Sequence, residues 1–197
     1  GPPQFADALH QFLNTLGIER VHLIGHRGGA LTSAHFATTR PTRVRKLILD
    51  ATPAWNRLDG RRYWKERMGA SWLDENGLLK PFEEWGGGVE RFPGLNKADR
   101  DVAIQRMSQD FSQHSRWFLS ILKEALSYDV YARLHKVQAP TLLVYAEKEW
   151  GRSSAERLLN SIVGSRSVII PKAGTIPAFE RPNEYVKAVL GFLDEPK

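Results

Sequence analysis

A glycine-rich run near the start of the chain holds the residues best suited to chemistry: Gly25-His26-Arg27-Gly28-Gly29. It follows a short apolar segment and precedes a segment of helical spacing, so we expect a strand-to-helix turn. The guanidinium of Arg27 is permanently charged and cannot attack a carbonyl carbon, but it can hold an anion. The run lacks the G-x-G-x-x-G spacing and its acidic residue, so we expect no dinucleotide site.

The composition narrows the remaining chemistry. The chain has 197 residues and no cysteine, which excludes a disulfide framework, a thiolate metal site and a cysteine nucleophile. The sequence shows neither a phosphate-binding loop nor a grouping of metal-ligating residues. We therefore expect no metal and no cofactor.

Alternating strand and helix patterns must position the glycine-rich turn. Short apolar runs predict strands from Val21 to Ile24 and over residues 47–49, 141–146 and 167–170. Helical spacing predicts helices over residues 6–16, 30–40, 153–162 and 183–193, the last with Val186, Val189, Leu190 and Leu193 facing inward. This alternation is typical of a parallel sheet with helices on its faces, an α/β fold.

The segment 55–135 breaks this rhythm and reads as an inserted helical unit, with 1–54 and 136–197 forming the core. It holds five of the six tryptophans: Trp55, Trp64, Trp72, Trp85 and Trp117. These rings fill a small core of their own or line a lid over an apolar pocket, and the two interpretations are compatible.

Three segments together resemble the α/β-hydrolase superfamily. They are VHLIGHRGGALTSAHFATTRPTRVRKLILDATP, APTLLVYAEKEW and IIPKAGTIPAFERPNEYVKAVLGFLDE, in the order and spacing of that family's nucleophile elbow, acid-bearing strand and histidine loop. The resemblance implies a mostly parallel eight-stranded sheet with helices on both faces and an inserted lid. The last four of those strands can be placed here, so we expect a partial sheet.

The positions that match the family's catalytic triad carry other residues. Arg27 stands for the serine of the G-x-S-x-G elbow, Glu149 for the acid and Thr175 for the histidine. Two of the three roles are lost, so ordinary serine hydrolysis is not expected. A relocated Asp50–His114 pair is conceivable but still lacks a nucleophile. Ser33 falls well inside the following helix.

Three outcomes remain open for Arg27: an ion pair with Glu149, a grip on a ligand anion, or exposure to water. A buried cation needs a counter-charge, and a helix N-terminus already favours anions. We expect a small apolar or anionic ligand. The candidate ligand-binding residues are Arg27, His26, Gly28, Trp55, His114 and Trp150, and the remaining oxyanion donor would be the N–H of Gly28.

These residues leave three hypotheses about function. The first is a catalytically degenerate, non-hydrolytic binding or interaction module with a lid-covered pocket. The alternative is an enzyme of the same fold with unusual chemistry, such as a lyase, cyclase or atypical hydrolase, that uses Arg27 as an electrostatic stabiliser. A third is a structural subunit completed by another chain.

The charge of the chain and its predicted edge strand indicate which binding partners to expect. The net charge of +6 comes without interleaved aromatic residues, so we expect solvated basic faces and no nucleic acid. We expect no membrane segment and no signal peptide, which favours the cytoplasm, and Gly1-Pro2 looks like a protease-cleavage remnant outside the fold. The apolar strand from Val21 to Ile24 would form a sheet edge, which predicts a homodimer or a partner chain pairing there.

Overall fold

The computed structural model describes residues 1–53, 57–63, 74–76, 80 and 92–196. The strands are β1 (Val21–His26), β2 (Val44–Asp50), β3 (Thr141–Ala146) and β4 (Arg166–Ile170). The α-helices are α1 (Pro2–Thr15), α2 (Gly28–Thr39), α3 (Arg57–Tyr63), α5 (Lys97–Ser127), α6 (Ala155–Ser161), α7 (Pro177–Glu180) and α8 (Pro182–Asp194). Short 3₁₀ turns are η1 (Pro41–Arg43), η4 (Tyr131–Lys136) and η5 (Trp150–Ser154).

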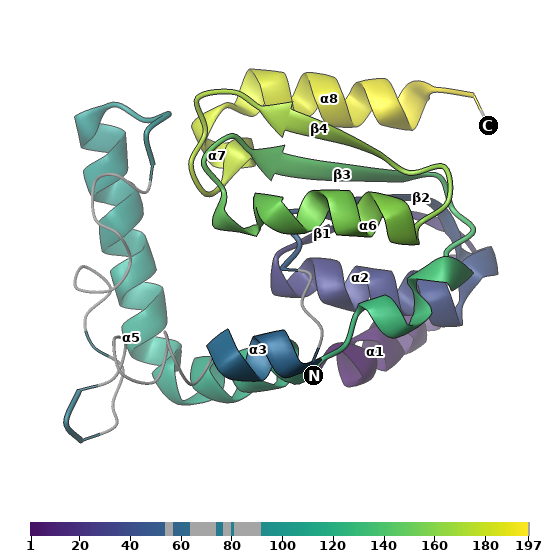
Figure 1. Cartoon of the computed structure of the whole chain (residues 1–197), viewed down its shortest axis with the longest axis horizontal. Coiled ribbons are helices and arrows are strands. Elements are labelled where there is room, and N and C mark those ends of the chain that lie inside the picture. The colour runs from purple at the N-terminus through teal and green to yellow at the C-terminus, as the bar shows by residue number, and fades with distance from the viewer. Residues whose placement is uncertain (54–56, 64–73, 77–79, 81–91, 197) are drawn as a thin grey trace.

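The four strands form one parallel sheet in the order β1-β2-β3-β4, which confirms the predicted α/β class and the partial sheet (Figure 1). Helix α8 covers one face, and α2 and α6 lie on the other. All four predicted strands are present, each within a few residues of the expected ends. In the described part of the chain β1 forms one edge of the sheet, and the pairing of a second chain there stays a prediction.

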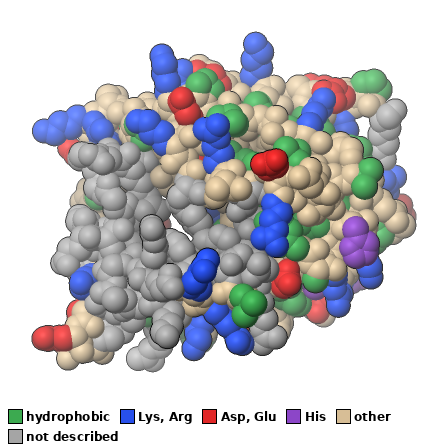
Figure 2. Space-filling model, in the orientation of Figure 1, with side chains coloured by type: hydrophobic (Ala, Val, Ile, Leu, Met, Phe, Trp, Pro, Cys, Tyr) green, Lys and Arg blue, Asp and Glu red, His purple; other side chains and the backbone are tan. Residues whose placement is uncertain are grey.

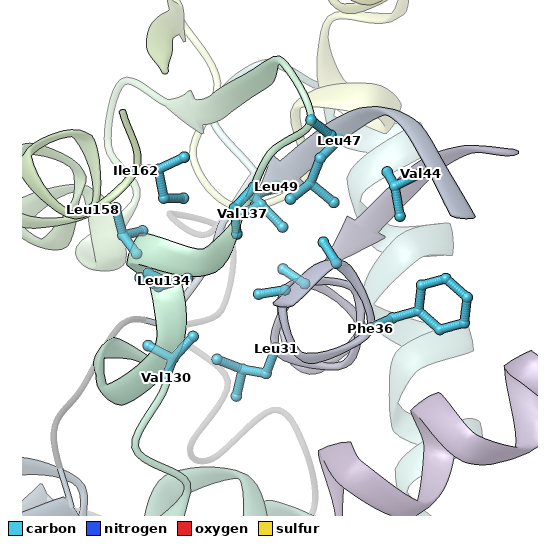
Figure 3. Close-up of a cluster of buried hydrophobic side chains, with 14 of the residues drawn as sticks. Leu31, Phe36, Val44, Leu47, Leu49, Val130, Leu134, Val137, Leu158 and Ile162 are labelled. Carbon is cyan, nitrogen blue, oxygen red and sulfur yellow. The ribbon is translucent and has the colours of Figure 1, made fainter. Parts of the chain in front are cut away.

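Two apolar cores hold these layers together. The larger lies between the sheet and the helices α2, η4 and α6, where the side chains of β2 alternate between the two faces. Leu47 and Leu49 point into this core, and Ile48 points into the smaller one beneath α8. Figure 3 shows the larger core, with Leu31, Phe36, Val44, Leu47, Leu49, Val130, Leu134, Val137, Leu158 and Ile162 labelled.

The two terminal helices differ from their predictions. Pro2 is buried and opens α1, where its fixed φ and missing N–H suit the first helical turn, so this helix begins four residues before the predicted Ala6. The origin of Gly1-Pro2 as a cleavage remnant stays a prediction. In α8 the side chains of Val186 and Leu190 are half exposed, because the larger rings of Tyr185 and Phe192 occupy the inward stripe with Val189.

The inserted segment is described in part. The long helix α5 packs with α3, where a Cβ on Gly60 would come within 1.7 Å of the Leu126 carbonyl oxygen. Trp117 on α5 is exposed, and Trp55, Trp64, Trp72 and Trp85 lie outside the described residues. The lid and the division at residues 55 and 135 therefore stay predictions.

In the view of Figure 2, lysine and arginine side chains are interspersed with aspartate and glutamate. Among the described helices, none combines the length and apolarity needed to cross a bilayer.

Candidate functional site

The elbow is a tight turn between β1 and α2. Arg27 has φ 50° and ψ −113°, a conformation that costs a non-glycine residue energy. Its N–H donates to the Asp50 carbonyl at 2.9 Å, and its own carbonyl accepts from the Ala30 N–H at 3.0 Å. These backbone hydrogen bonds, with a longer one from the Leu31 N–H to the Arg27 carbonyl at 3.4 Å, hold Arg27 at the tip of the turn.

Gly25 allows α2 to pack tightly on the strand before the elbow. A Cβ at this position would lie 2.4 Å from the Gly29 carbonyl oxygen and 2.5 Å from the Ser33 hydroxyl oxygen. The glycine is therefore required by close approach rather than by an unusual φ. Ser33 itself is buried in α2, as the sequence predicts.

The side chain of Arg27 connects three segments that are far apart in sequence. Its Nη2 donates to Oε2 of Glu149 at 2.9 Å and, more weakly, to the Thr175 carbonyl oxygen at 3.4 Å. The Glu149 side chain is 1% exposed, and that of Arg27 is 26% exposed. The predicted Arg27–Glu149 ion pair is confirmed, with the carboxylate buried and the guanidinium partly open to solvent.

Glu149 is fixed by its own local structure. It caps the 3₁₀ turn η5, its Oε1 accepts from the Gly151 N–H at 3.5 Å, and its N–H donates to the Ala146 carbonyl at the end of β3. Glu149 therefore lies three residues after the end of β3. Its buried carboxylate requires a counter-charge, which Arg27 supplies.

The loop that carries Thr175 is organised by Glu180, which the sequence analysis missed. This buried carboxylate accepts N–H groups from Gly174 at 2.9 Å, Thr175 at 2.7 Å and Ile176 at 2.9 Å. It also accepts from Gly94 at 3.1 Å, a residue of the inserted segment that lies just before α5. The one signal in the sequence was an acidic residue after the apolar stretch 176–179.

A second polar group lies behind the elbow. The carboxylate of Asp50, at the end of β2, accepts from His26 Nδ1 at 2.9 Å and from the Tyr185 hydroxyl at 3.2 Å. Burial and the charge of Asp50 raise the pKa of Tyr185 well above its usual range, so the phenol stays a donor. Asp50 thus pairs with His26, and the predicted Asp50–His114 pair stays untested because the His114 side chain lies outside the described residues.

A cavity of about 570 Å³ lies beside β1, between the ends of α1, α2 and α5 that line it. His26 and Gly28 line it, whereas Arg27, Glu149 and Thr175 are not among its lining residues. Trp55 and the side chains of His114 and Trp150 lie outside the part of the chain that the structure describes. The candidate ligand residues therefore divide between two places.

The geometry limits what the elbow can do. The guanidinium of Arg27 is bonded to a carboxylate and cannot act as a nucleophile, and the hydroxyl of Thr175 cannot act as a base near neutral pH. Within the described residues, no three His, Cys, Asp or Glu side chains come together in a way that would hold a metal ion. The exposed part of the guanidinium can bind an anion.

Comparisons with known proteins agree with the fold. A sequence model of the alpha/beta hydrolase family matches residues 1–188. The putative 2-succinyl-6-hydroxy-2,4-cyclohexadiene-1-carboxylate synthase of Bacillus subtilis (strain 168) is 24% identical over 192 residues, which cover 94% of this chain and 70% of that protein. The 2-hydroxy-6-oxononadienedioate/2-hydroxy-6-oxononatrienedioate hydrolase 2 of Pseudomonas putida is 26% identical, covering 95% of this chain and 68% of its own length.

Solved structures show the same architecture. The enol-lactonase from Burkholderia xenovorans LB400 superposes with a TM-score of 0.69 at 18% identity, covering 98% of this chain and 73% of the lactonase. A bacterial membrane phospholipase A superposes with a TM-score of 0.72 at 20% identity, covering 98% of this chain. This chain spans 63% of the phospholipase.

Proposed function

Because the chain belongs to the alpha/beta hydrolase family, we propose that it is a catalytically degenerate member that binds a small carboxylate without hydrolysing an ester. The 2.9 Å contact between Arg27 and Glu149 carries this proposal. A guanidinium held there by a buried carboxylate occupies the place where family members carry a nucleophile. Loss of the nucleophile or the base alone costs several orders of magnitude in rate.

The partly exposed guanidinium supports an anionic ligand. Arginine has five N–H donors in a planar fork, and the contacts with Glu149 and Thr175 both use Nη2. The remaining donors suit a carboxylate, which accepts two parallel hydrogen bonds. The names of the two curated relatives include a carboxylate and a dioate, which fits this ligand class. The predicted lid would cover this site.

Calorimetric titration with succinate and benzoate tests the proposal. The matched neutral ligands are dimethyl succinate and methyl benzoate. We expect at least one carboxylate to bind, its methyl ester to bind about tenfold more weakly, and Arg27→Met to remove that difference. Arg166→Met, which removes an exposed arginine on β4, is the matched control and leaves binding unchanged. Equal affinity for acid and ester, or unchanged binding by Arg27→Met, would exclude Arg27 as the anchor.

The second candidate is an enzyme with unusual chemistry, in which Arg27 stabilises negative charge that develops on the substrate. The synthase name of one curated relative favours keeping it. Incubation of the carboxylate that binds best, followed by mass spectrometry, separates the two. Turnover that disappears in Arg27→Met supports the enzyme, and recovery of intact ligand supports the binding module.

A further inference from the structure

The two carboxylate oxygens of Glu180 have different partners. Oε1 accepts from the N–H groups of Thr175 at 2.7 Å and Ile176 at 2.9 Å. Oε2 accepts from the N–H groups of Gly174 at 2.9 Å and Gly94 at 3.1 Å. The side chain is buried, so these bonds form away from water. One oxygen therefore holds the loop that carries Thr175, and the other joins this loop to the inserted segment.

One peptide group of this loop lies between Glu180 and Arg27. The peptide that joins Thr175 to Ile176 donates its N–H to Oε1 of Glu180 at 2.9 Å. The carbonyl oxygen of the same peptide accepts from Nη2 of Arg27 at 3.4 Å. Because a peptide group is planar and rigid, a bond that fixes its N–H also fixes the direction of its carbonyl. Glu180 therefore orients the carbonyl that Arg27 contacts.

Gly94 packs closely against Glu180. A Cβ at this position would lie 2.9 Å from the Cβ of Glu180 and 2.9 Å from the Lys172 carbonyl oxygen, so the contact requires a glycine. Phe92, on one side of Gly94 in the chain, is buried, and Asn96, on the other side, is the N-cap of α5. Figure 1 shows α7, which ends at Glu180, at the end of the sheet that faces α5. The start of α5 is thus tied to the loop through Gly94.

We propose that Glu180 is a positioning residue for the carboxylate site at Arg27 and that it couples this site to the start of α5. The carboxylate site rests on the function proposed above, whereas the contacts of Glu180 do not. The Thr175 carbonyl and Glu149 both accept from Nη2, which leaves the other guanidinium donors for a ligand. A carboxylate bound at Arg27 should stabilise the Gly94 contact, and that contact should favour binding by the same factor.

Two replacements in the full chain separate these contacts. Glu180→Gln places an NH₂ group against one pair of N–H donors, and an amide-to-ester replacement at Gly94 removes only the N–H that reaches Oε2. The matched control is an amide-to-ester replacement at Gly17, whose N–H donates to the Asn14 carbonyl at 3.0 Å. In ¹⁵N-arginine-labelled protein without ligand, both replacements should shift the Nη resonance of Arg27, which is identified by its loss in Arg27→Met. The control should leave that resonance in place.

Carboxylate affinity is the second readout. For whichever of succinate and benzoate binds, we expect Glu180→Gln and the Gly94 ester each to weaken binding about threefold, because a weak hydrogen bond is lost. By reciprocity, the bound carboxylate should slow hydrogen exchange of the Gly94 N–H by about the same threefold factor.

The two outcomes for Arg27 decide the inference. A resonance unmoved in Glu180→Gln would exclude the positioning role, and one unmoved by the Gly94 ester would exclude the coupling to α5, so either result overturns the inference. If neither carboxylate binds the unmodified chain, the proposed function fails, and the resonance of the ligand-free protein still decides the role of Glu180. If Glu180→Gln does not fold, the Gly94 ester and its Gly17 control provide the test.

Discussion

Arg27 and Glu149 are 122 positions apart in sequence, and the structure joins them by one 2.9 Å hydrogen bond at the elbow. The two side chains differ in exposure, since the carboxylate is buried and the guanidinium is partly exposed. Removing the arginine strands a buried charge, whereas removing the glutamate leaves a cation that can turn toward water.

This inequality predicts different costs for the two single variants. Arg27→Ala should destabilise the fold by about 3 kcal/mol, and Glu149→Ala should cost less. The double variant should cost less than the sum of the two. Urea unfolding of all four proteins measures the coupling. The exposed Arg166–Glu195 pair serves as the control and should couple by less than about 1 kcal/mol. A coupling energy no larger than that of the control pair would show that the Arg27–Glu149 ion pair does not stabilise the fold.

Glu180 should be needed to hold the loop that carries Thr175. Glu180→Ala removes the acceptor of four backbone N–H groups, and each buried donor left unpaired costs about 1–3 kcal/mol. We expect faster amide hydrogen exchange at residues 174–176 and a lower urea midpoint. Glu156→Ala, on α6, is the matched control. Unchanged exchange at residues 174–176 would mean that other contacts hold the loop.

The buried Lys46 should anchor the end of α8. Its Nζ donates to the carbonyls of Phe192 at 2.8 Å, Leu193 at 2.9 Å and Glu195 at 2.5 Å, groups that lack helical partners at a C-terminus. Lys46→Met keeps the apolar stem and removes the charge, so we expect a loss of about 2–3 kcal/mol. Lys187→Met, at an exposed position of the same helix, should change stability by less than about 0.5 kcal/mol. Equal losses of stability in Lys46→Met and Lys187→Met would rule out an anchoring role for Lys46.

His35 should make stability fall in mild acid. Burial, then the charges of Arg133 and Arg40, lower the pKa of His35 below its ordinary value of 6.5. The unfolded chain therefore binds this proton more readily, and stability is lost as the pH falls through 6.5 toward the lower folded value. Unfolding at pH 7.5 and pH 5 should show a smaller pH difference for His35→Gln than for the unmodified chain. An unchanged pH difference would assign the acid sensitivity to other groups.

The strands were predictable because they depend on local apolar patterns. The Arg27–Glu149 ion pair was predictable because the order of the motifs resembles that of a known family. Residues 141–146 form β3 with the predicted ends, because an apolar run after a proline defines a buried strand. The buried partners of Asp50 and Glu180 were missed, since a carboxylate's burial depends on segments that meet only in the folded chain. The inward face of α8 was misjudged because apolar residues cover more than one stripe and the larger rings take the buried positions.

Restoring the serine alone should restore little activity. Arg27→Ser supplies a hydroxyl but leaves Thr175 where the base is required, so we expect ester hydrolysis close to background. The double variant Arg27→Ser, Thr175→His supplies both roles beside Glu149 and should hydrolyse p-nitrophenyl acetate faster than the single variant. Equal rates would mean that the geometry around the elbow no longer supports a triad.

The most direct test of the central claim is intact-mass spectrometry after incubation with a fluorophosphonate, a reagent that labels activated serines. The unmodified chain has Arg27 at the elbow and Thr175 at the base position, so we predict that its mass does not change. Stoichiometric labelling of one serine, lost when that serine is replaced by alanine, would contradict the account.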